Sequence, residues 1–291
     1  MRFAEKRKEK RSASKDIVVF YHADCTDGFT AAWVAWKKFG DKADYVAVFY
    51  NDRPPKLVNK EIYMLDMCFP KEVVKLLMRS NKRVTAIDHH VSRKEAILTT
   101  YKSLYSDKHC GATLAWQYFF PNKPPPKFLL HVEDYDFWRH SLNGTEELYS
   151  YLEMFDYTFN IWSKIIKDFE DIHKRKEILR SGRLLLKYQI KIVEYNIKNN
   201  ARLVKFAGHK VYAINTNYSV SLTGHLLYKK QPPFAIMWYE QGNGLIKVSL
   251  RGDKTVDCSR IAAKYKDGGG HIDSAGFYLE SLKDIPWTII K

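Results

Sequence analysis

The sequence predicts an α/β protein with a mostly parallel doubly wound sheet, a helical connector and a smaller α/β domain with a mixed sheet. Strand-like and helix-like runs alternate up to about residue 140, which is typical of parallel sheets with helices on both faces. Between about 145 and 200, apolar residues recur at three- and four-residue spacing on a charged background, which indicates long helices. Strand-like runs then return.

The first domain is expected to contain four strands and four helices. The strands are expected at 16–21, 44–50, 61–65 and 83–87, each rich in Val, Ile, Phe or Tyr. The helices are expected at 28–39, 70–79, 110–120 and 126–133. Pro70 stands at a helix start, and the proline-rich stretch 121–126 separates the last two helices.

The second domain is expected to be smaller and to contain three strands, at 211–215, 234–240 and 245–250. QGNG at 241–244 predicts a hairpin turn between the last two, because Gly and Asn accept the backbone conformation of tight turns. Helices are expected at 219–229 and 257–266. The predicted boundaries are a basic, disordered arm at 1–15, a catalytic domain at 16–144, a helical connector at 145–202 and a substrate-binding domain at 203–291.

Composition restricts the class of protein. A hydrophobic share of 45% in 291 residues is enough for two packed cores and argues against a disordered chain. No apolar run reaches the roughly 18 residues of a membrane span, and the charged N-terminus does not resemble a secretory signal. The four cysteines form no CxxC pair, which favours a reducing compartment, and we expect a cytoplasmic protein without disulfides or structural zinc.

The chain carries a formal net charge of +15. Residues 1–15 contribute seven basic and two acidic side chains, a net charge of +5, and the remainder is spread through the chain. Phosphates attract lysine and arginine, so this charge favours a polyanionic partner. A surface that serves only solubility is the alternative, and the charge alone leaves both open.

Acidic and imidazole side chains follow three of the predicted strands. Because the carboxyl ends of parallel strands form the ligand crevice of an open sheet, these side chains should meet there. One aspartate after a strand is usually a helix cap, but three strand ends of this kind favour a site. A further acidic cluster at 133–136 follows a helix and could close it. The strand-end residues are His22, Asp24 and Asp27; Asp66; and Asp88, His89 and His90.

Several carboxylates with two or three imidazoles suit Mn²⁺, or Mg²⁺, better than structural zinc. Two such ions about 3.5–4 Å apart could turn a bridging water into hydroxide and stabilise charge on a phosphoryl group. The residues therefore predict two divalent cations and metal-assisted hydrolysis of a phosphate ester or anhydride.

The motifs resemble those of the DHH phosphoesterase superfamily. AIDHHVS at 86–92 resembles its signature, HADCTDG at 22–28 and LDM at 65–67 occupy the places of its first two motifs, and DYDFW at 134–138 resembles the fourth. KDGGGHIDSAG at 266–276 is similar to the GGGHxxAAG motif of the DHHA1 substrate-binding domain. The form of the first motif looks most like the oligoribonuclease B-type (NrnB-like) branch.

The resemblance implies roles for named residues. It implies that Asp88 orients His89 and that His90 faces the substrate phosphate. Asp136 is an alternative to Asp134 as the last ligand. The first motif departs from the family pattern because Cys25 stands two residues before Asp27, which leaves open whether Asp24 or Cys25 coordinates. The implied metal ligands are His22, Asp24, Asp27, Asp66, His89 and Asp134.

The resemblance also implies the substrate. In the second domain it assigns phosphate binding to Arg251 and to Gly268, Gly269, Gly270 and His271. The helix start at 109–113 either points N–H groups at phosphate or is only a packed helix entry. We expect a phosphodiesterase that degrades short RNA or DNA oligonucleotides to mononucleotides in the cleft between the domains. The alternatives are a cyclic (di)nucleotide, 3′-phosphoadenosine 5′-phosphate or polyphosphate as substrate, or an inactive nucleic-acid-binding module. No membrane partner is expected, and a homodimer is left open.

Overall fold

The computed structural model describes residues 15–49 and 52–290 and divides into two compact units, with the division between Leu186 and Lys187. Except for Lys15, the predicted basic arm lies outside the described residues. Each unit has its own sheet.

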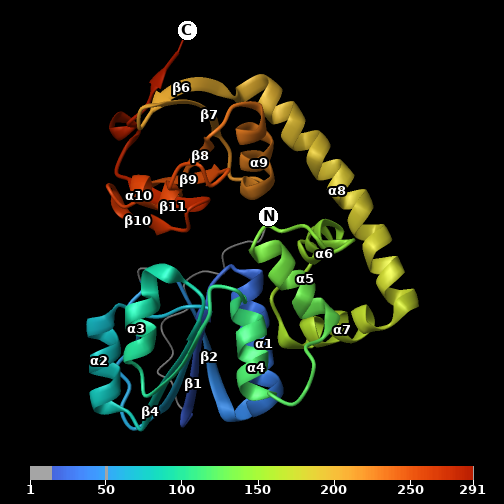
Figure 1. The fold of residues 1–291 in the computed structure, drawn as a ribbon, viewed down its shortest axis with the longest axis vertical. Coiled ribbons are helices and arrows are strands. Elements are labelled where there is room, and N and C mark those ends of the chain that lie inside the picture. Colours follow the sequence, from blue (N-terminus) through green and yellow to red (C-terminus); the bar gives the residue numbers. More distant parts are fainter. Residues whose placement is uncertain (1–14, 50–51, 291) are drawn as a thin grey trace. The chain divides into compact units, whose positions relative to one another are not determined.

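The first unit is built on a five-stranded, wholly parallel sheet with the strand order β2-β1-β3-β4-β5 (Figure 1). In β1 the three central residues, Val18, Val19 and Phe20, are fully buried, as expected where helices cover both faces. The chain order changes direction at β1, so the β1/β3 boundary is the topological switch point where open sheets of this kind bind ligands. The strands are β1 (Ile17–His22), β2 (Ala43–Val48), β3 (Glu61–Leu65), β4 (Arg83–Asp88) and β5 (Lys102–Tyr105).

Two helical layers cover this sheet. Helices α1 (Thr26–Phe39) and α4 (Gly111–Phe119) pack on one face, and α2 (Lys71–Ser80) and α3 (Lys94–Thr99) pack on the other (Figure 1). The first layer is itself covered by α5 (Lys127–Asp136), α6 (Thr145–Leu152) and α7 (Phe159–Glu170). This second shell hides the apolar outer face of α1, whose alanines and Trp33 would otherwise meet water.

The segment 145–202 is not a separate connector along its whole length. Leu148 on α6 and Trp162 on α7 are fully buried in the core of the first unit, and the indole N–H of Trp162 donates to Oγ1 of Thr30 on α1. Only α8 (Ile172–Asn200) is shared: Ile178 belongs to the first core, whereas Val193 belongs to a core of the second unit.

The second unit is a seven-stranded mixed sheet with the order β10-β11-β9-β8-β7-β6-β12. Only β7 and β8 are parallel, and every other neighbouring pair is antiparallel. Helix α9 (Val220–Lys230) packs on one face and α10 (Cys258–Ala262) on the other. The strands are β6 (Arg202–Phe206), β7 (His209–Asn215), β8 (Phe234–Glu240), β9 (Ile246–Gly252), β10 (Lys266–Gly270), β11 (Ser274–Leu279) and β12 (Thr288–Ile289).

The predicted fold class is confirmed, including the hairpin at 241–244, where the N–H of Gln241 donates to the carbonyl of Leu245. Six of the described α-helices and strands were not predicted: α3, β5, β6, β10, β11 and β12. Strand β10 contains Gly268, Gly269 and Gly270, which strands normally disfavour, so its composition predicts a loop. The predicted helix 257–266 ends earlier, at Ala262.

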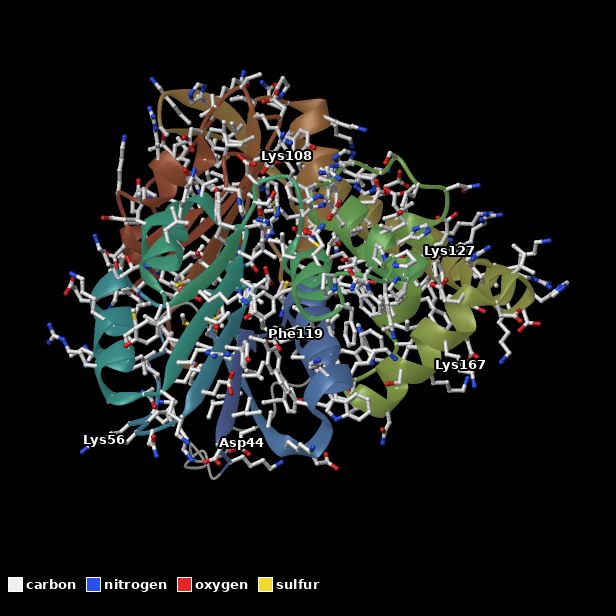
Figure 2. The ribbon with its side chains drawn as sticks, turned by 60° about the horizontal axis from the view of Figure 1, so that its bottom comes forward. Asp44, Lys56, Lys108, Phe119, Lys127 and Lys167 are labelled. Carbon is white, nitrogen blue, oxygen red and sulfur yellow. The ribbon has the colours of Figure 1, made fainter. Side chains whose placement is uncertain are left out.

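Basic side chains stand out from the surface of the first unit. Figure 2 shows Lys56 and Lys167 at its periphery, and both are exposed, whereas Phe119 is buried. Among the described residues, no helix combines the length and the apolar character that a membrane crossing requires.

Candidate metal centre

The parallel sheet brings the three predicted strand ends together. His22 is the last residue of β1, Asp66 follows β3, and Asp88 is the last residue of β4. These strands are direct neighbours, because β1 pairs with β3 and β3 pairs with β4. The functional side chains therefore collect at the switch point between β1 and β3.

Asp66 lies at the centre of this collection. Its Oδ2 is 3.6 Å from Nδ1 of His22 and 3.6 Å from Sγ of Cys25, and its Oδ1 is 3.2 Å from Nε2 of His89. The residue is 1% exposed and has a φ of +55°, an uncommon backbone conformation for a residue other than glycine. Burial would raise the pKa of Asp66, but the imidazoles of His22 and His89 outweigh it and hold that pKa well below its usual range.

His89 connects Asp66 to two further carboxylates. Its Nε2 lies 3.8 Å from Oδ2 of Asp27 and 3.6 Å from Oδ2 of Asp136. Burial would lower the pKa of His89, but Asp66, Asp136 and Asp27 together raise it to about 10. Burial and the charge of Asp66 raise the pKa of Asp136 despite the opposing effect of His89. This site therefore attracts positive charge.

The donor atoms form three overlapping groups in which every atom lies within 4.8 Å of the others. Asp66 belongs to two groups and His89 to two. Within the described residues, Oδ1 of Asp66 is buried and accepts no well-aligned hydrogen bond, and the same holds for Oδ2 of Asp88. Buried carboxylate oxygens of this kind normally have a partner, so the donor set fits a divalent cation. The groups are Asp66, Asp88, His89 and His90; His22, Cys25 and Asp66; and Asp27, His89 and Asp136.

The first turn of α4 holds the carboxylate of Asp27. The N–H of Gly111 donates to Oδ2 at 2.6 Å and the N–H of Ala112 donates to Oδ1 at 2.7 Å. The positive end of the helix dipole adds to this attraction. The sequence left open whether the N–H groups at 109–113 point at phosphate. Those of Gly111 and Ala112 do not, because they donate to the carboxylate of Asp27.

A glycine is required at position 111 because the chain passes very close to Asp66. A Cβ at this position would lie 2.5 Å from Cβ of Asp66 and 2.9 Å from its Cα. Any side chain there would push Asp66 out of its place in the cluster.

Asp88 organises the loop that carries the two histidines. Its Oδ1 accepts the backbone N–H of His89 at 2.7 Å and lies 2.6 Å from Nδ1 of His90. The imidazole that contacts Asp88 is therefore that of His90, whereas the resemblance assigned Asp88 to His89. Burial lowers the pKa of His90, but Asp88 outweighs this and raises it.

Asp134 and Asp136 lie on different sides of α5. The carboxylate of Asp134 accepts hydrogen bonds from Ser141 (N–H and Oγ), from Leu142 N–H and from Oγ1 of Thr145. It therefore stabilises the turn into α6, and it belongs to none of the three donor groups. Asp136, the alternative ligand, is the one that approaches His89.

The geometry also separates Asp24 from Cys25. Asp24 is exposed, has a φ of +50° and is absent from the donor groups, whereas Cys25 lies in one of them. Burial, with the charges of Asp66 and Asp27, raises the pKa of the Cys25 thiol well above its usual range. A bound cation would be needed to displace that proton.

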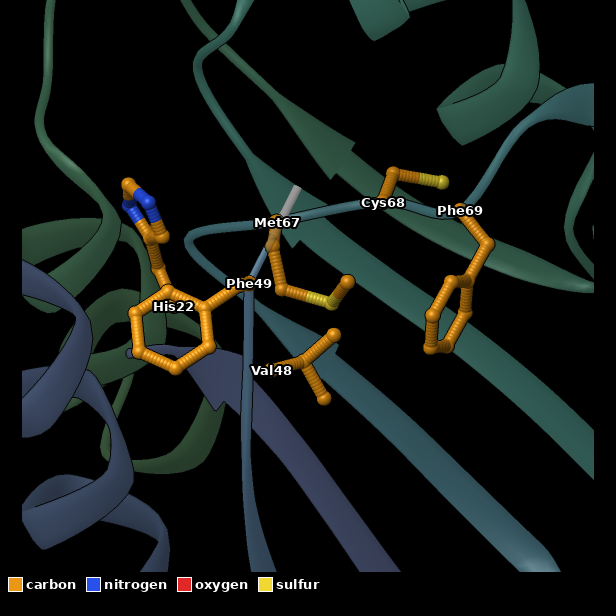
Figure 3. A pocket seen from close by; sticks show the side chains of 6 residues that line it. All are labelled: His22, Val48, Phe49, Met67, Cys68 and Phe69. Atoms are coloured by element: carbon orange, nitrogen blue, oxygen red, sulfur yellow. The ribbon is translucent and has the colours of Figure 1, made fainter. Parts of the chain in front are cut away.

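A small pocket adjoins His22 and opens to solvent (Figure 3). Its other walls are apolar, and the ring of Phe49 is the most prominent, because the residue is 51% exposed. The sequence does not indicate this pocket, because nothing in its pattern marks where β2 ends relative to β1. The lining residues are His22, Val48, Phe49, Met67, Cys68 and Phe69.

Glu133 was part of the predicted acidic cluster at 133–136, but the sequence did not indicate its contacts. It is 8% exposed, and its carboxylate contacts Nδ1 of His109, accepts the N–H of Cys110 and pairs with Arg139. Glu133 thereby joins the start of α4 to the end of α5. The first holds the carboxylate of Asp27, and the second carries Asp136.

In the second unit the predicted residues lie on or next to β9 and β10, the two strands that flank β11. Arg251 on β9 is opposite Ser274 on β11, and the carbonyl of Ser274 accepts the N–H of His271 at 2.7 Å. Gly269 is opposite Gly276 and Gly270 is opposite Ala275, so the glycines are part of the sheet. Nε and one Nη of Arg251 lie 3.4 Å from Oγ of Ser221 near the start of α9.

No protein family model matches the chain. Among curated proteins, it is similar to an uncharacterized protein, R106, from Acanthamoeba polyphaga mimivirus. The two are 25% identical over 291 aligned positions, which cover 91% of this chain and 68% of the relative.

The solved structures with some likeness include three from bacteria. An uncharacterized protein from Helicobacter pylori G27 gives a TM-score of 0.43 at 14% identity, with 91% of this chain and 93% of the other covered. An exopolyphosphatase-related protein from Bacteroides fragilis gives 0.48 at 13% identity, covering 91% and 87%. RecJ in complex with Mn²⁺ from Thermus thermophilus gives 0.47 at 13% identity, covering 90% of this chain and 49% of RecJ. Likeness at this level assigns neither a family nor an activity to the chain.

Proposed function

We propose that this chain is a metal-dependent phosphodiesterase that hydrolyses short RNA or DNA oligonucleotides to mononucleotides. The observation that carries the proposal is the convergence of three donor groups on Asp66 and His89 at the switch point of a parallel sheet. The order of motifs, which resembles that of DHH phosphoesterases, supports it independently.

Six residues would hold two divalent ions, with Mn²⁺ expected before Mg²⁺. Ions bound there supply the Lewis acidity that activates water and neutralises charge on a phosphoryl group. Asp66 contributes most, because its buried carboxylate faces His22 and Cys25 with one oxygen and His89 with the other. The six residues are His22, Cys25, Asp27, Asp66, His89 and Asp136.

His90 is the best candidate for proton transfer to the leaving oxygen. Asp88 contacts Nδ1 at 2.6 Å and thereby fixes the orientation of the ring, and against the effect of burial its charge raises the pKa of the imidazole. A histidine held in this way can act as a general acid through its other ring nitrogen.

The substrate's phosphate and base have separate candidate partners. In the second unit, Arg251 on β9 and His271, which follows β10, both lie beside the start of β11 and provide donors suited to a phosphodiester. In the first unit the exposed ring of Phe49 beside His22 offers a surface on which a base could stack. The net charge of +15 favours the approach of a polyanion.

The proposal is tested by hydrolysis assays on the full chain in Mn²⁺. The substrates are 5′-labelled RNA and DNA of two to ten residues, with a cyclic dinucleotide, 3′-phosphoadenosine 5′-phosphate and inorganic polyphosphate in parallel. We expect mononucleotide release from the oligonucleotides and a loss of roughly 10³-fold in rate for Asp66→Asn, which corresponds to about 4 kcal/mol of transition-state stabilisation. The control Asp41→Asn, at an exposed aspartate, should keep the wild-type rate.

Preference for one of the other three substrates would reject the oligonucleotide assignment and keep the phosphoesterase. An Asp66→Asn rate equal to that of the wild type, or no hydrolysis of any phosphoester, would reject the enzyme altogether.

A further inference from the structure

We propose that Cys25 supplies a sulfur ligand to one of two unlike metal positions. The first position would be formed by His22, Cys25 and Asp66, and the second by Asp27, His89 and Asp136. The sulfur-containing position would take a softer divalent ion such as Zn²⁺, Fe²⁺ or Co²⁺, whereas the second would suit Mn²⁺ or Mg²⁺. The inference rests on the metal centre of the proposed function and deepens it.

The spacing of the three donor atoms fits a single ion. Sγ of Cys25 and Nδ1 of His22 each lie 3.6 Å from the same oxygen of Asp66. Ligands at about 2.0–2.3 Å from a tetrahedral ion are about 3.5 Å from one another. An ion could therefore be bound between these atoms with little movement of the side chains.

The burial of Asp66 is a second observation that points to a bound ion. The residue is 1% exposed, and its Oδ1 is buried without a well-aligned hydrogen bond from the described residues. The thiol is a weak donor to the other oxygen, at 3.6 Å. The near partners of this buried carboxylate are the ring nitrogens of His22 and His89 and the thiol of Cys25, all of which can bind a cation.

Helix capping does not account for a cysteine at this position. Sγ of Cys25 accepts the N–H of Gly28 at 3.5 Å and so caps α1. Ser, Thr, Asp and Asn are much better caps than a sulfur atom, which is a weak acceptor. Any of these four would make a stronger cap, so the thiol has to be explained by something other than the helix.

Core packing does not account for it either. Cys68, Cys110 and Cys258 are buried members of the apolar cores, with 5%, 0% and 0% exposure. Cys25 is only partly buried and belongs to none of these cores. Its surroundings are instead the polar donors of the metal centre.

Sulfur changes which ion the position prefers. Thiolate ligands favour Zn²⁺ and other soft or borderline ions, whereas carboxylates and water suit Mg²⁺ and Mn²⁺. The two positions would therefore differ in selectivity although they lie within one cluster. The matched variant is Cys25→Asp, which keeps a donor at the same position and replaces sulfur by oxygen.

Co²⁺ titration of the full chain tests the inference, because Co²⁺ accepts oxygen, nitrogen and sulfur ligands and reports sulfur by a charge-transfer band in the near ultraviolet. The wild type and Cys258→Ala should show this band together with visible absorption. Cys25→Ser and Cys25→Asp should lose the band and keep the visible absorption of the second position. Competition should show at least a 10-fold lower Zn²⁺ affinity for Cys25→Asp, with Mn²⁺ affinity kept or raised.

Two results would overturn the sulfur ligand and leave the metal centre of the proposed function intact. One is a wild-type protein that binds Co²⁺ without the band, and the other is a band that persists in Cys25→Ser. Failure to bind Co²⁺ at all would overturn both. A band in a protein that hydrolyses no phosphoester would reject the proposed function and keep the sulfur ligand. X-ray absorption of the wild type, with a sulfur neighbour expected at about 2.3 Å, reads the same ligand without a variant.

Discussion

The backbone N–H of Gly111 donates a hydrogen bond to Oδ2 of Asp27 at 2.6 Å, which joins the first turn of α4 to a carboxylate on α1. The same glycine lies against Asp66, where no side chain would fit. One residue thus positions two of the carboxylates in the candidate metal centre, one by hydrogen bonding and the other by leaving room for it.

Gly111→Ala should damage the centre and the fold together. The added Cβ would lie 2.5 Å from Cβ of Asp66, so the backbone or Asp66 must shift, at a cost of about 1–3 kcal/mol in the free energy of unfolding. We expect a Mn²⁺ affinity at least 10-fold lower. Urea unfolding in chelator and Mn²⁺ titration measure the two effects. Gly242→Ala, with open space around the new atom, is the control. Wild-type Mn²⁺ affinity in Gly111→Ala would show that Asp66 does not need this close approach.

Asp136→Asn should weaken metal binding without weakening the fold. Asp136 approaches His89 in a donor group, and its pKa is raised by burial and by the charge of Asp66. Removing its charge should lower Mn²⁺ affinity roughly 10- to 100-fold while the free energy of unfolding in chelator stays the same or rises. Calorimetric titration and urea unfolding check both. An unchanged affinity would remove Asp136 from the ligand set.

Asp134→Asn should have the opposite effect: it should weaken the fold and leave metal binding unchanged. Burial alone would raise the pKa of Asp134, but hydrogen bonds from Ser141, Thr145 and Leu142 outweigh it and lower the pKa from 3.8 to about 2. A carboxylate with a lowered folded-state pKa stabilises the protein above its unfolded pKa, and this contribution is lost as the pH falls from about 4 to about 2. We expect the variant to be about 2 kcal/mol less stable at pH 7, with the difference from wild type shrinking below pH 4.

Urea unfolding across this pH range measures the effect, and Asp41→Asn serves as the comparison at an exposed site. A difference that stays constant down to pH 2 would mean that the stability comes from side-chain shape and not from the charge of Asp134.

The strands that carry the site and the residues at their ends were predictable, because short continuous stretches of the sequence mark both. Buried parallel strands are continuous apolar runs, and β1, β3 and β4 are such runs, each followed at once by acidic or imidazole side chains. Parallel strands end at the same edge, so the meeting of His22, Asp66 and His89 follows from the alternation of strands and helices.

The choice between Asp134 and Asp136 was not predictable, because the two positions are about 200° apart around a helix. Helix α5 continues to Asp136, beyond the expected end at 133, and only its packing decides which carboxylate reaches His89. Tertiary contacts also decide the partner of the α4 N–H groups, since Asp27 lies 84 residues earlier in the chain. The glycine-rich strand β10 was missed because pairing with β11 overrides its composition.

Metal analysis of the chain after dialysis against Co²⁺ tests the central claim most directly, because both donor sets accept this ion. We predict two ions per wild-type chain and at most one per chain of Asp66→Asn, since Asp66 faces His22 and Cys25 with one oxygen and His89 with the other. No bound Co²⁺ in the wild type, or two ions in Asp66→Asn, would contradict a metal centre built around Asp66.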